Sequence, residues 1–489
     1  MMFASLFTSR IVLDVLGATD YGIYNIIGGV IILFSFLNQA LSSATQRYLN
    51  FYIGKKEYKN VNSVFCMSMN TYIILSIAIV IMAETVGLWF MKTYLNIPSD
   101  RMAAANWVFQ FTIITFVINL IRIPYNASII AYERMDFYAY ISLVEVGLKL
   151  AVVYLLYISP YDKLIIYSFL YTIIPLIITF CYRMYCNRVL TTTHYSFCWD
   201  KTIFKNLFSF SSWSLFGSIA NLSAQQGLNI LINIFYGVTV NAAAGIANQV
   251  SSNVYHFISN FQVAFNPQIV KNYALNKIEE FNKLVFQTSK FSYFLMFILV
   301  LPISITTDSI LAIWLKEVPV YTSIFCRLIL AFLMIEALSA PLWMAVQATG
   351  NIKIYQLSLG GIILLNFPIA YIVLKMGGEV YLVWVVRIII NLISFLFRCW
   401  YLKKYLDFPL LSYMKKVVYP VGTVTILAFP IAYFFSEFIK FSLFINLTIN
   451  IIFSLSVVLT CIYCIGLNPN EKEKIIQLIT NKLNIILKK

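Results

Sequence analysis

Five basic residues lie inside long apolar stretches of the sequence, where a charge is costly. They are Arg10, Arg122, Lys149, Arg327 and Arg387. A charged side chain at membrane depth normally faces a partner or a water-filled cavity. Guanidinium and ammonium groups bind phosphate oxygens well. A cavity that gathered these cations would therefore suit an anionic head group.

Amide and hydroxyl side chains recur every three or four residues in several of the same stretches, so they share one face of a helix. One such face includes Trp384, Arg387, Asn391, Ser394 and Arg398. We predict that these faces line a cavity. Its polar lining would include Asn25, Gln39, Asn119, Asn221, Gln225 and Asn248. The alternative is that the amides hydrogen-bond packed helices to one another.

Nearby carboxylates offer a simpler reason for some of the cations. Arg10 and Asp14, like Glu145 and Lys149, are spaced i,i+4 and could neutralise each other. Arg327 and Arg398 could instead reach the membrane surface from helix ends. Asp14 and Glu145 are also the candidates for a site that binds a coupling proton or sodium ion. Glu84, Asp308 and Glu336 are further candidates for that site.

The composition identifies a polytopic membrane protein. Of 489 residues, 61% are hydrophobic and only 11% are charged, with a mean hydropathy of +0.81. Soluble domains are about half apolar and about a quarter charged. The net charge of +15 does not indicate a nucleic-acid partner, because the basic residues lie in short loops between apolar runs.

Fourteen apolar spans are expected, which predicts an all-α fold. Their centres lie near residues 10, 32, 77, 115, 147, 172, 220, 252, 300, 332, 364, 389, 427 and 453. Loops after even-numbered spans, together with the C-terminal tail, carry 24 Lys and Arg residues, and loops after odd-numbered spans carry 6. This bias places both termini in the cytoplasm. The odd-numbered loops are too short to form an extracytoplasmic domain.

A short internal repeat suggests two similar lobes. Gly17-Ala18-Thr19 recurs in the second half of the chain as Gly237-Val238-Thr239, and an amide-bearing helix follows each copy. We therefore expect two six-helix lobes, related by a pseudo-two-fold axis along the membrane normal, around a central cavity. The predicted parts are an N-terminal lobe at 1–190, a cytoplasmic linker at 191–206, a C-terminal lobe at 207–410, two further spans at 411–467 and a basic amphipathic tail at 468–489.

The sequence contains none of the common catalytic or nucleotide-binding motifs. It lacks G-x-x-x-x-G-K-[ST] and H-E-x-x-H, and its two histidines are isolated. Cys461 and Cys464 lie within the last apolar run and are interpreted as buried small hydrophobic residues. We predict no enzyme, no cofactor and no metal site. Transport would then depend on alternating access, driven by an ion gradient or the membrane potential.

Two motifs resemble those of a known family. The runs LGATDYGIYN at 16–25 and PYNASIIAYERM at 124–135 resemble bacterial polysaccharide flippases of the Wzx type. These belong to the multidrug/oligosaccharidyl-lipid/polysaccharide exporter (MOP) superfamily. The resemblance implies twelve to fourteen helices in two lobes around a V-shaped cavity with a cationic lumen. It also implies flipping of undecaprenyl-diphosphate-linked oligosaccharide across the bacterial inner membrane, for surface polysaccharides such as O-antigen, lipopolysaccharide or capsule.

The first apolar run is shorter than expected. About 16 residues precede Gly17, whereas a span needs ~20, and relatives of the Wzx type carry upstream residues that complete this helix. Either the helix tilts and thins the bilayer, or the true start lies upstream.

Three functions remain open at this stage. In the first, a flippase holds the diphosphate of a lipid-linked oligosaccharide against Arg10, Arg122, Lys149 and Arg387. The alternative is a cation-coupled small-molecule or drug antiporter of the multidrug extruder type, whose cationic substrates favour acidic cavities. A membrane polymerase or ligase would need a larger extracytoplasmic loop. The expected partners are the lipid-linked oligosaccharide, membrane lipids and polysaccharide polymerase or assembly proteins, and we expect a monomer.

Overall fold

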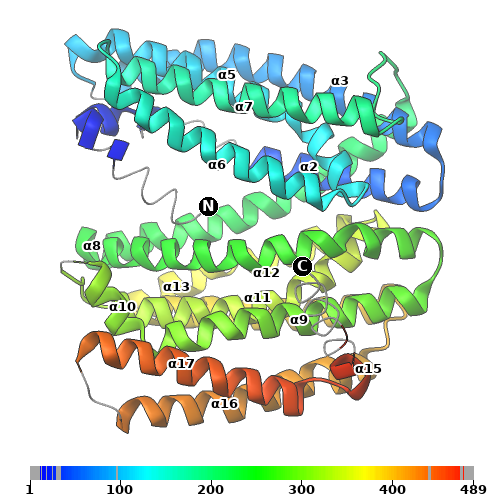
Figure 1. Ribbon diagram of the computed structural model, residues 1–489, viewed down its shortest axis with the longest axis vertical. Coiled ribbons are helices and arrows are strands. Elements are labelled where there is room, and N and C mark those ends of the chain that lie inside the picture. The colour runs from blue at the N-terminus through cyan, green and yellow to red at the C-terminus, as the bar shows by residue number, and fades with distance from the viewer. Residues whose placement is uncertain are drawn as a thin grey trace, which may run out of the picture. The chain divides into compact units, whose positions relative to one another are not determined.

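The computed structural model describes residues 11–12, 14–17, 19–24, 26–28, 35–94, 97–315, 317–438, 442–473 and 477. Every regular element in these ranges is a helix (Figure 1), so the predicted all-α class is confirmed. Within the same ranges, ten helices are long and apolar enough to cross a membrane. The predicted total of fourteen spans stays a prediction, since the expected centres at 10 and 32 lie outside the described residues.

The first group of helices is built around α5 (Met102–Ala131), which packs against α2, α3 and α7. The other members are α2 (Ser35–Gly54), α3 (Tyr58–Met82), α4 (Leu88–Tyr94), α6 (Met135–Ile158) and α7 (Lys163–Val189). A π-helical turn at Ala83–Gly87 joins α3 to α4, and a 3-10 turn at Ser99–Arg101 precedes α5.

The later helices run from α8 to α17. Their bounds are α8 (Lys201–Ala274), α9 (Ile278–Ile305), α10 (Thr307–Trp314), α11 (Thr322–Thr349), α12 (Lys353–Leu364), α13 (Asn366–Lys375), α14 (Leu382–Leu406), α15 (Leu410–Tyr413), α16 (Tyr419–Phe438) and α17 (Leu443–Cys461). Every predicted span centre from residue 77 to residue 453 falls within one of the helices from α3 to α17.

A single glycine interrupts the helical backbone of α8. Gly237 has φ 80° and ψ −176°, which separates 201–236 from 238–274. This backbone region is essentially restricted to glycine. Gly17, the glycine in the first copy of the repeat, also has a positive φ, 77°. The two copies of the repeat therefore share a backbone feature as well as a sequence pattern.

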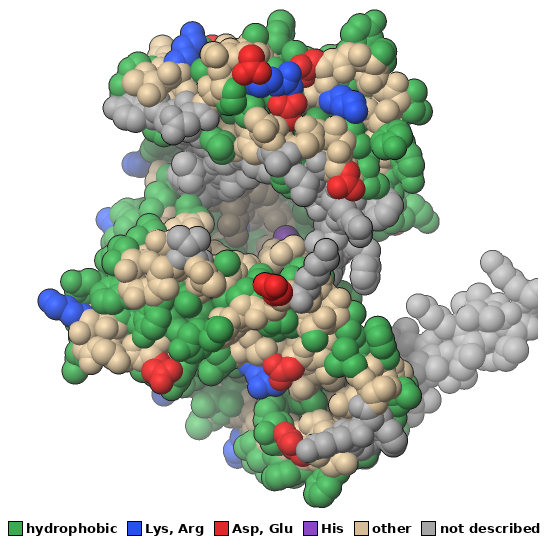
Figure 2. Space-filling model, turned by 90° about the vertical axis from the view of Figure 1, so that its left-hand side faces the viewer, with side chains coloured by type: hydrophobic (Ala, Val, Ile, Leu, Met, Phe, Trp, Pro, Cys, Tyr) green, Lys and Arg blue, Asp and Glu red, His purple; other side chains and the backbone are tan. Residues whose placement is uncertain are grey.

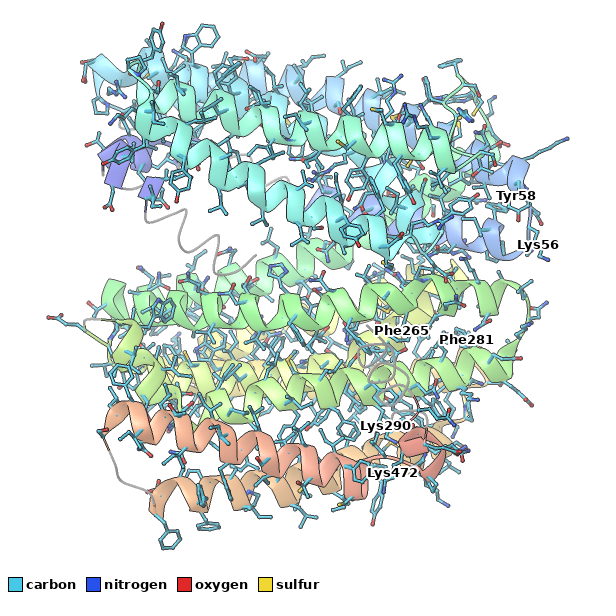
Figure 3. The ribbon with its side chains drawn as sticks, in the orientation of Figure 1. Lys56, Tyr58, Phe265, Phe281, Lys290 and Lys472 are labelled. Atoms are coloured by element: carbon cyan, nitrogen blue, oxygen red, sulfur yellow. The ribbon has the colours of Figure 1, made fainter. Side chains whose placement is uncertain are left out.

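A second pair of turns has the same spacing in sequence as Gly17 and Gly237. Lys56 follows α2 with φ 59°, and Asn276 follows α8 with φ 55°. In both turns the backbone N–H of this residue donates to the carbonyl three residues earlier at 3.0 Å, and the next helix begins two residues later. Lys56 is labelled in Figure 3. These matched turns support an internal repeat, while the pseudo-two-fold axis itself stays a prediction.

By its contacts the chain forms two compact units, each of which we describe by itself. Unit 1 comprises the described residues of Met1–Ile219, Val270–Asn276 and Gln347–Leu357, and unit 2 those of Ala220–Ile269, Lys277–Val346 and Ser358–Lys489. Tyr72, Phe116 and Leu120 belong to the core of unit 1, and Phe325 and Trp384 to that of unit 2. The domain boundaries predicted from the sequence stay predictions.

Many large apolar side chains are exposed on the surface of the described residues. The face in Figure 2 carries many hydrophobic side chains and few charged ones. Large side chains such as Ile81, Tyr157 and Phe438 are 60%, 74% and 85% exposed. Soluble monomers rarely expose such large contiguous apolar areas. This surface and the ten apolar helices support a multi-pass membrane protein; the bacterial inner membrane and the cytoplasmic termini stay predictions.

Ion pairs connect loops of the same parity at the ends of unit 1. Arg101 pairs with Asp20 and, at 2.6 Å, with Asp162, so three odd-numbered loops meet. Lys271 pairs with Glu133, which joins two even-numbered loops. Burial by itself would raise the pKa of the Asp162 carboxyl. Hydrogen bonds from Arg101 and from two backbone N–H groups outweigh this effect, so the pKa is lowered. These ion pairs agree with the predicted topology, in which odd-numbered and even-numbered loops lie on opposite sides of the membrane.

Candidate functional site

A cavity of about 310 Å³ lies within unit 2. Helices α8, α11, α12, α13 and α14 line it. Four of the predicted site residues are among its lining: Asn221, Gln225, Asn248 and Arg387. Asn221 and Gln225 precede Gly237 and Asn248 follows it, so the interruption in α8 lets both segments contribute.

Arg387 lines this cavity and has no direct counter-ion among the described residues. Its guanidinium carbon lies 4.4 Å from the ring centre of Phe332 and 5.4 Å from that of Trp384. Aromatic faces attract such a cation and hold the side chain in place without neutralising it. In the part of the chain that the structure describes, no carboxylate lies within 4.0 Å of Arg387. An anionic ligand could therefore pair with it.

A second arginine in the cavity has a carboxylate beside it. Arg398 Nη1 lies 3.7 Å from Glu336 Oε2. From the sequence, Arg398 could reach the membrane surface from a helix end, but the structure buries it at 6% exposure in the cavity wall. Its place on the same helical face as Arg387 was the signal for this position. With two arginines and one glutamate, the cavity lining is cationic.

Amides supply most of the remaining polarity. Asn391 Nδ2 donates to the carbonyl of Phe332 at 3.3 Å, and Asn366 Nδ2 donates to that of Ile363 at 2.7 Å. Asn366 Oδ1 is buried and has no hydrogen-bond partner among the described residues. Asn248 Nδ2 reaches Asn229 Oδ1 at 3.4 Å. Such a lining offers both donors and acceptors, which suits a ligand with hydroxyl groups.

Arg122 and Lys149 lie in unit 1 and share one carboxylate. Glu145 is 2.8 Å from Lys149 Nζ and 3.7 Å from Arg122 Nη1. The i,i+4 neutralisation considered from the sequence is thus confirmed for Glu145 and Lys149. Arg122 adds a second cation to the same group. These residues line neither the unit 2 cavity nor the pocket of about 520 Å³ in unit 1.

The other predicted site residues are dispersed. Asn119 is half-buried on α5, Gln39 is exposed on α2, and Asp14 is exposed. Arg10 and Asn25 lie outside the described residues. The structure therefore places four predicted residues together in unit 2 and keeps two others around Glu145.

Arg47 and Lys290, which the sequence places among the 24 basic residues of the even-numbered loops and the tail, are buried inside helices. Arg47 in α2 donates from Nη2 to the carbonyl of Ala348 at 3.1 Å. Lys290 in α9 is 2% exposed and pairs with Glu471 at 2.7 Å; Figure 3 labels this lysine. Both assignments were wrong because each burial depends on a segment far away along the chain.

Comparisons with known proteins identify the fold. No family model and no curated protein matches the chain. A solved structure of MATE in complex with MaL6 matches with a TM-score of 0.73 at 12% identity, covering 85% of this chain and 93% of that chain. An outward-facing multidrug resistance MATE family transporter of the MOP superfamily matches with a TM-score of 0.71 at 13% identity, covering 81% and 89%.

A third solved structure also matches the chain. It is a MOP superfamily transporter from Pyrococcus furiosus, whose binding pocket has a reverse polarity that suggests a different function for that protein. The TM-score is 0.70 at 12% identity, covering 84% of this chain and 93% of that chain. The chain thus has the fold of MATE transporters. None of these three matches is named as a polysaccharide flippase, so the resemblance to the Wzx type stays a prediction.

Proposed function

We propose that the chain is a membrane transporter of the MOP superfamily that moves an anionic, hydroxyl-rich amphiphile by alternating access. The substrate we infer is undecaprenyl-diphosphate-linked oligosaccharide, carried across the bacterial inner membrane for surface polysaccharide assembly. The observation behind this proposal is Arg387, a cation without a direct carboxylate partner in an amide-lined cavity of unit 2.

The cavity residues would bind different parts of the substrate. Arg387 would pair with diphosphate oxygens through charge-assisted hydrogen bonds. Asn221, Gln225 and Asn248 would hydrogen-bond to sugar hydroxyls. The polyprenyl chain would stay in the bilayer. Glu145, already beside two cations in unit 1, is the carboxylate we propose for ion coupling.

The second candidate is a small-molecule extruder. The solved structures favour it over the first, since one match is a multidrug resistance transporter. Glu336 also gives the cavity a carboxylate that a cationic drug could use. The cationic lining favours the first candidate. The sign of the charge on the preferred ligand decides between the two candidates.

Ligand binding to the purified protein tests the two candidates directly. The anionic probe is farnesyl diphosphate and the cationic probe is ethidium, both followed by calorimetry. Arg387→Ala should weaken farnesyl diphosphate binding about 10- to 100-fold, because a hydrogen bond to a charged group contributes about 1.5–3 kcal/mol. Arg327→Ala is the matched control, since Arg327 pairs with Asp308 and does not line the cavity. Binding of ethidium but not of farnesyl diphosphate would favour the extruder.

A cellular experiment tests the role in surface polysaccharide assembly. A deletion strain should lose surface polysaccharide and regain it with the wild-type chain or with Arg327→Ala, but not with Arg387→Ala. Immunoblots of the membrane fraction control for the amount of each variant. Normal polysaccharide with increased drug sensitivity in the deletion strain would contradict the proposal.

A further inference from the structure

We propose that unit 1 carries a binding site for one anionic phospholipid, separate from the transport cavity. The site is an open pocket of about 520 Å³ between α3 and α7, with α5 as its floor. We call it the α3–α7 groove. Its apolar wall includes Met69, Ile73, Ile118, Ile121, Leu176 and Phe180.

The apolar part of the groove is open to its surroundings. Leu176 and Phe180 are 54% and 59% exposed, and all three helices qualify as membrane spans. An acyl chain gains little hydrophobic free energy by moving from the bilayer into such a groove, because both environments are apolar. The apolar wall therefore has to match the chain in shape, and the polar end decides which lipid binds.

The polarity of the groove changes along one face of α7. Phe180, Arg183 and Asn187 are spaced by three and four residues and all line the pocket. Arg183 lies six residues before the end of α7 at Val189, which is about 9 Å along the helix axis. That depth corresponds to the head-group region when the helix crosses the bilayer. The predicted orientation places this end in the cytoplasm, where anionic lipids attract basic side chains.

The polar end is fixed by hydrogen bonds to α3. Asn62 Nδ2 donates to the carbonyls of Thr192 and His194 at 3.0 and 2.9 Å. Tyr195 Oη donates to Asn70 Oδ1 at 2.7 Å. The segment that follows α7 is thereby held along α3, with His194 and Tyr195 in the pocket wall. These hydrogen bonds hold the polar end of the groove in place, so it is not a chance grouping of surface residues.

Charge complementarity selects an anionic head group. Arg183 forms no ion pair with any carboxylate in the described ranges, and the pocket lining contains no acidic residue. Asn187, His194 and Tyr195 add polar groups for phosphate or glycerol oxygens. Thr179 Oγ1 is buried in the same wall without a hydrogen-bond partner among the described residues. A phosphodiester with a glycerol head group matches these features better than a zwitterionic choline lipid.

Native mass spectrometry of the full-length purified chain tests the site, with phosphatidylglycerol and phosphatidylcholine as competing probes. The wild-type chain should retain one phosphatidylglycerol in preference to phosphatidylcholine. Arg183→Ala should reduce the retained phosphatidylglycerol at least about 5-fold. Arg188→Ala should not, because Arg188 is an exposed arginine of the same helix outside the pocket lining.

Two further variants distinguish binding in the groove from an indirect effect of losing a charge. Ile121→Trp should reduce retention by filling the groove without a change in charge. Arg387→Ala should retain the lipid normally, because the site does not depend on the proposed transport function. Thermal melting of each variant in lipid-free detergent confirms folding, and Arg183→Lys should recover part of the binding if Arg183→Ala is unstable. Equal losses for Arg183→Ala and Arg188→Ala, or no preference for phosphatidylglycerol in the wild type, would overturn the proposal.

Discussion

At the scale of single residues, Glu145 is the carboxylate whose loss should be felt most in unit 1. It lies 2.8 Å from Lys149 and 3.7 Å from Arg122 and is 27% exposed. Glu145→Gln would leave two like charges facing each other at membrane depth. We expect a loss of about 1–2 kcal/mol in the free energy of unfolding, less than for a fully buried pair. Chemical unfolding in detergent measures it.

The matched variant for Glu145 is a double substitution. Glu145→Gln combined with Lys149→Gln removes one of the two cations and should recover part of the lost stability, as in a double-mutant cycle. An unfolding midpoint of Glu145→Gln equal to that of the wild type would show that the three groups act independently.

The sequence predicts some of the residues of the cavity and misses others for physical reasons. Arg387 stands out because a cation in the middle of an apolar run is visible without a structure. The burial of Lys290 depends on Glu471, which lies 181 residues further along the chain. No local pattern could indicate that pairing. Arg398 could be placed on the face of Arg387 by periodicity, but its approach to Glu336 on α11 required the packed helices.

At the scale of elements, the interruption in α8 should depend on one glycine. Gly237 has a conformation that side chains rarely adopt, so Gly237→Ala should cost about 1–3 kcal/mol of stability. Gly245 is the matched control, because it lies in the same helix and an added Cβ would meet nothing within 4 Å. Gly245→Ala should be neutral or stabilising by up to about 1 kcal/mol. Thermal melting of both variants measures the difference, and equal melting temperatures would contradict the argument.

The internal repeat shows what local sequence can and cannot predict. Gly17 and Gly237 could be matched from the sequence, because glycine marks a position with unusual backbone freedom. The turns at Lys56 and Asn276 could not, since a lysine and an asparagine share no sequence pattern there. Their positive φ values, 59° and 55°, follow from the need to end one helix and begin the next.

At the scale of the whole molecule, composition and charge predicted more of the fold than residue patterns did. The low fraction of charged residues and the regular apolar runs predicted an all-helical membrane protein, because a bilayer requires backbone groups to be paired within each segment. The division into two compact units and the cavity inside unit 2 depend on packing between distant helices. In the sequence, the repeat alone predicted those features, and it did so only in outline.

The orientation of the chain can be tested in each unit separately. The test uses exposed lysines in a variant whose eight cysteines are replaced by serine. Lys163 lies at the start of α7 in an odd-numbered loop, and Lys59 lies at the start of α3 in an even-numbered loop. Lys375 and Lys403 form the equivalent pair in unit 2.

A membrane-impermeant maleimide should label Lys163→Cys and Lys375→Cys in intact spheroplasts. Lys59→Cys and Lys403→Cys should react only after the membrane is made permeable. The reason is the excess of basic residues in the even-numbered loops, which keeps those loops in the cytoplasm. Because each unit has its own pair of positions, labelling of Lys163→Cys together with Lys403→Cys would show that the two units have opposite orientations. That outcome would contradict a repeat of parallel lobes, even though the matched glycines and turns remain in the backbone.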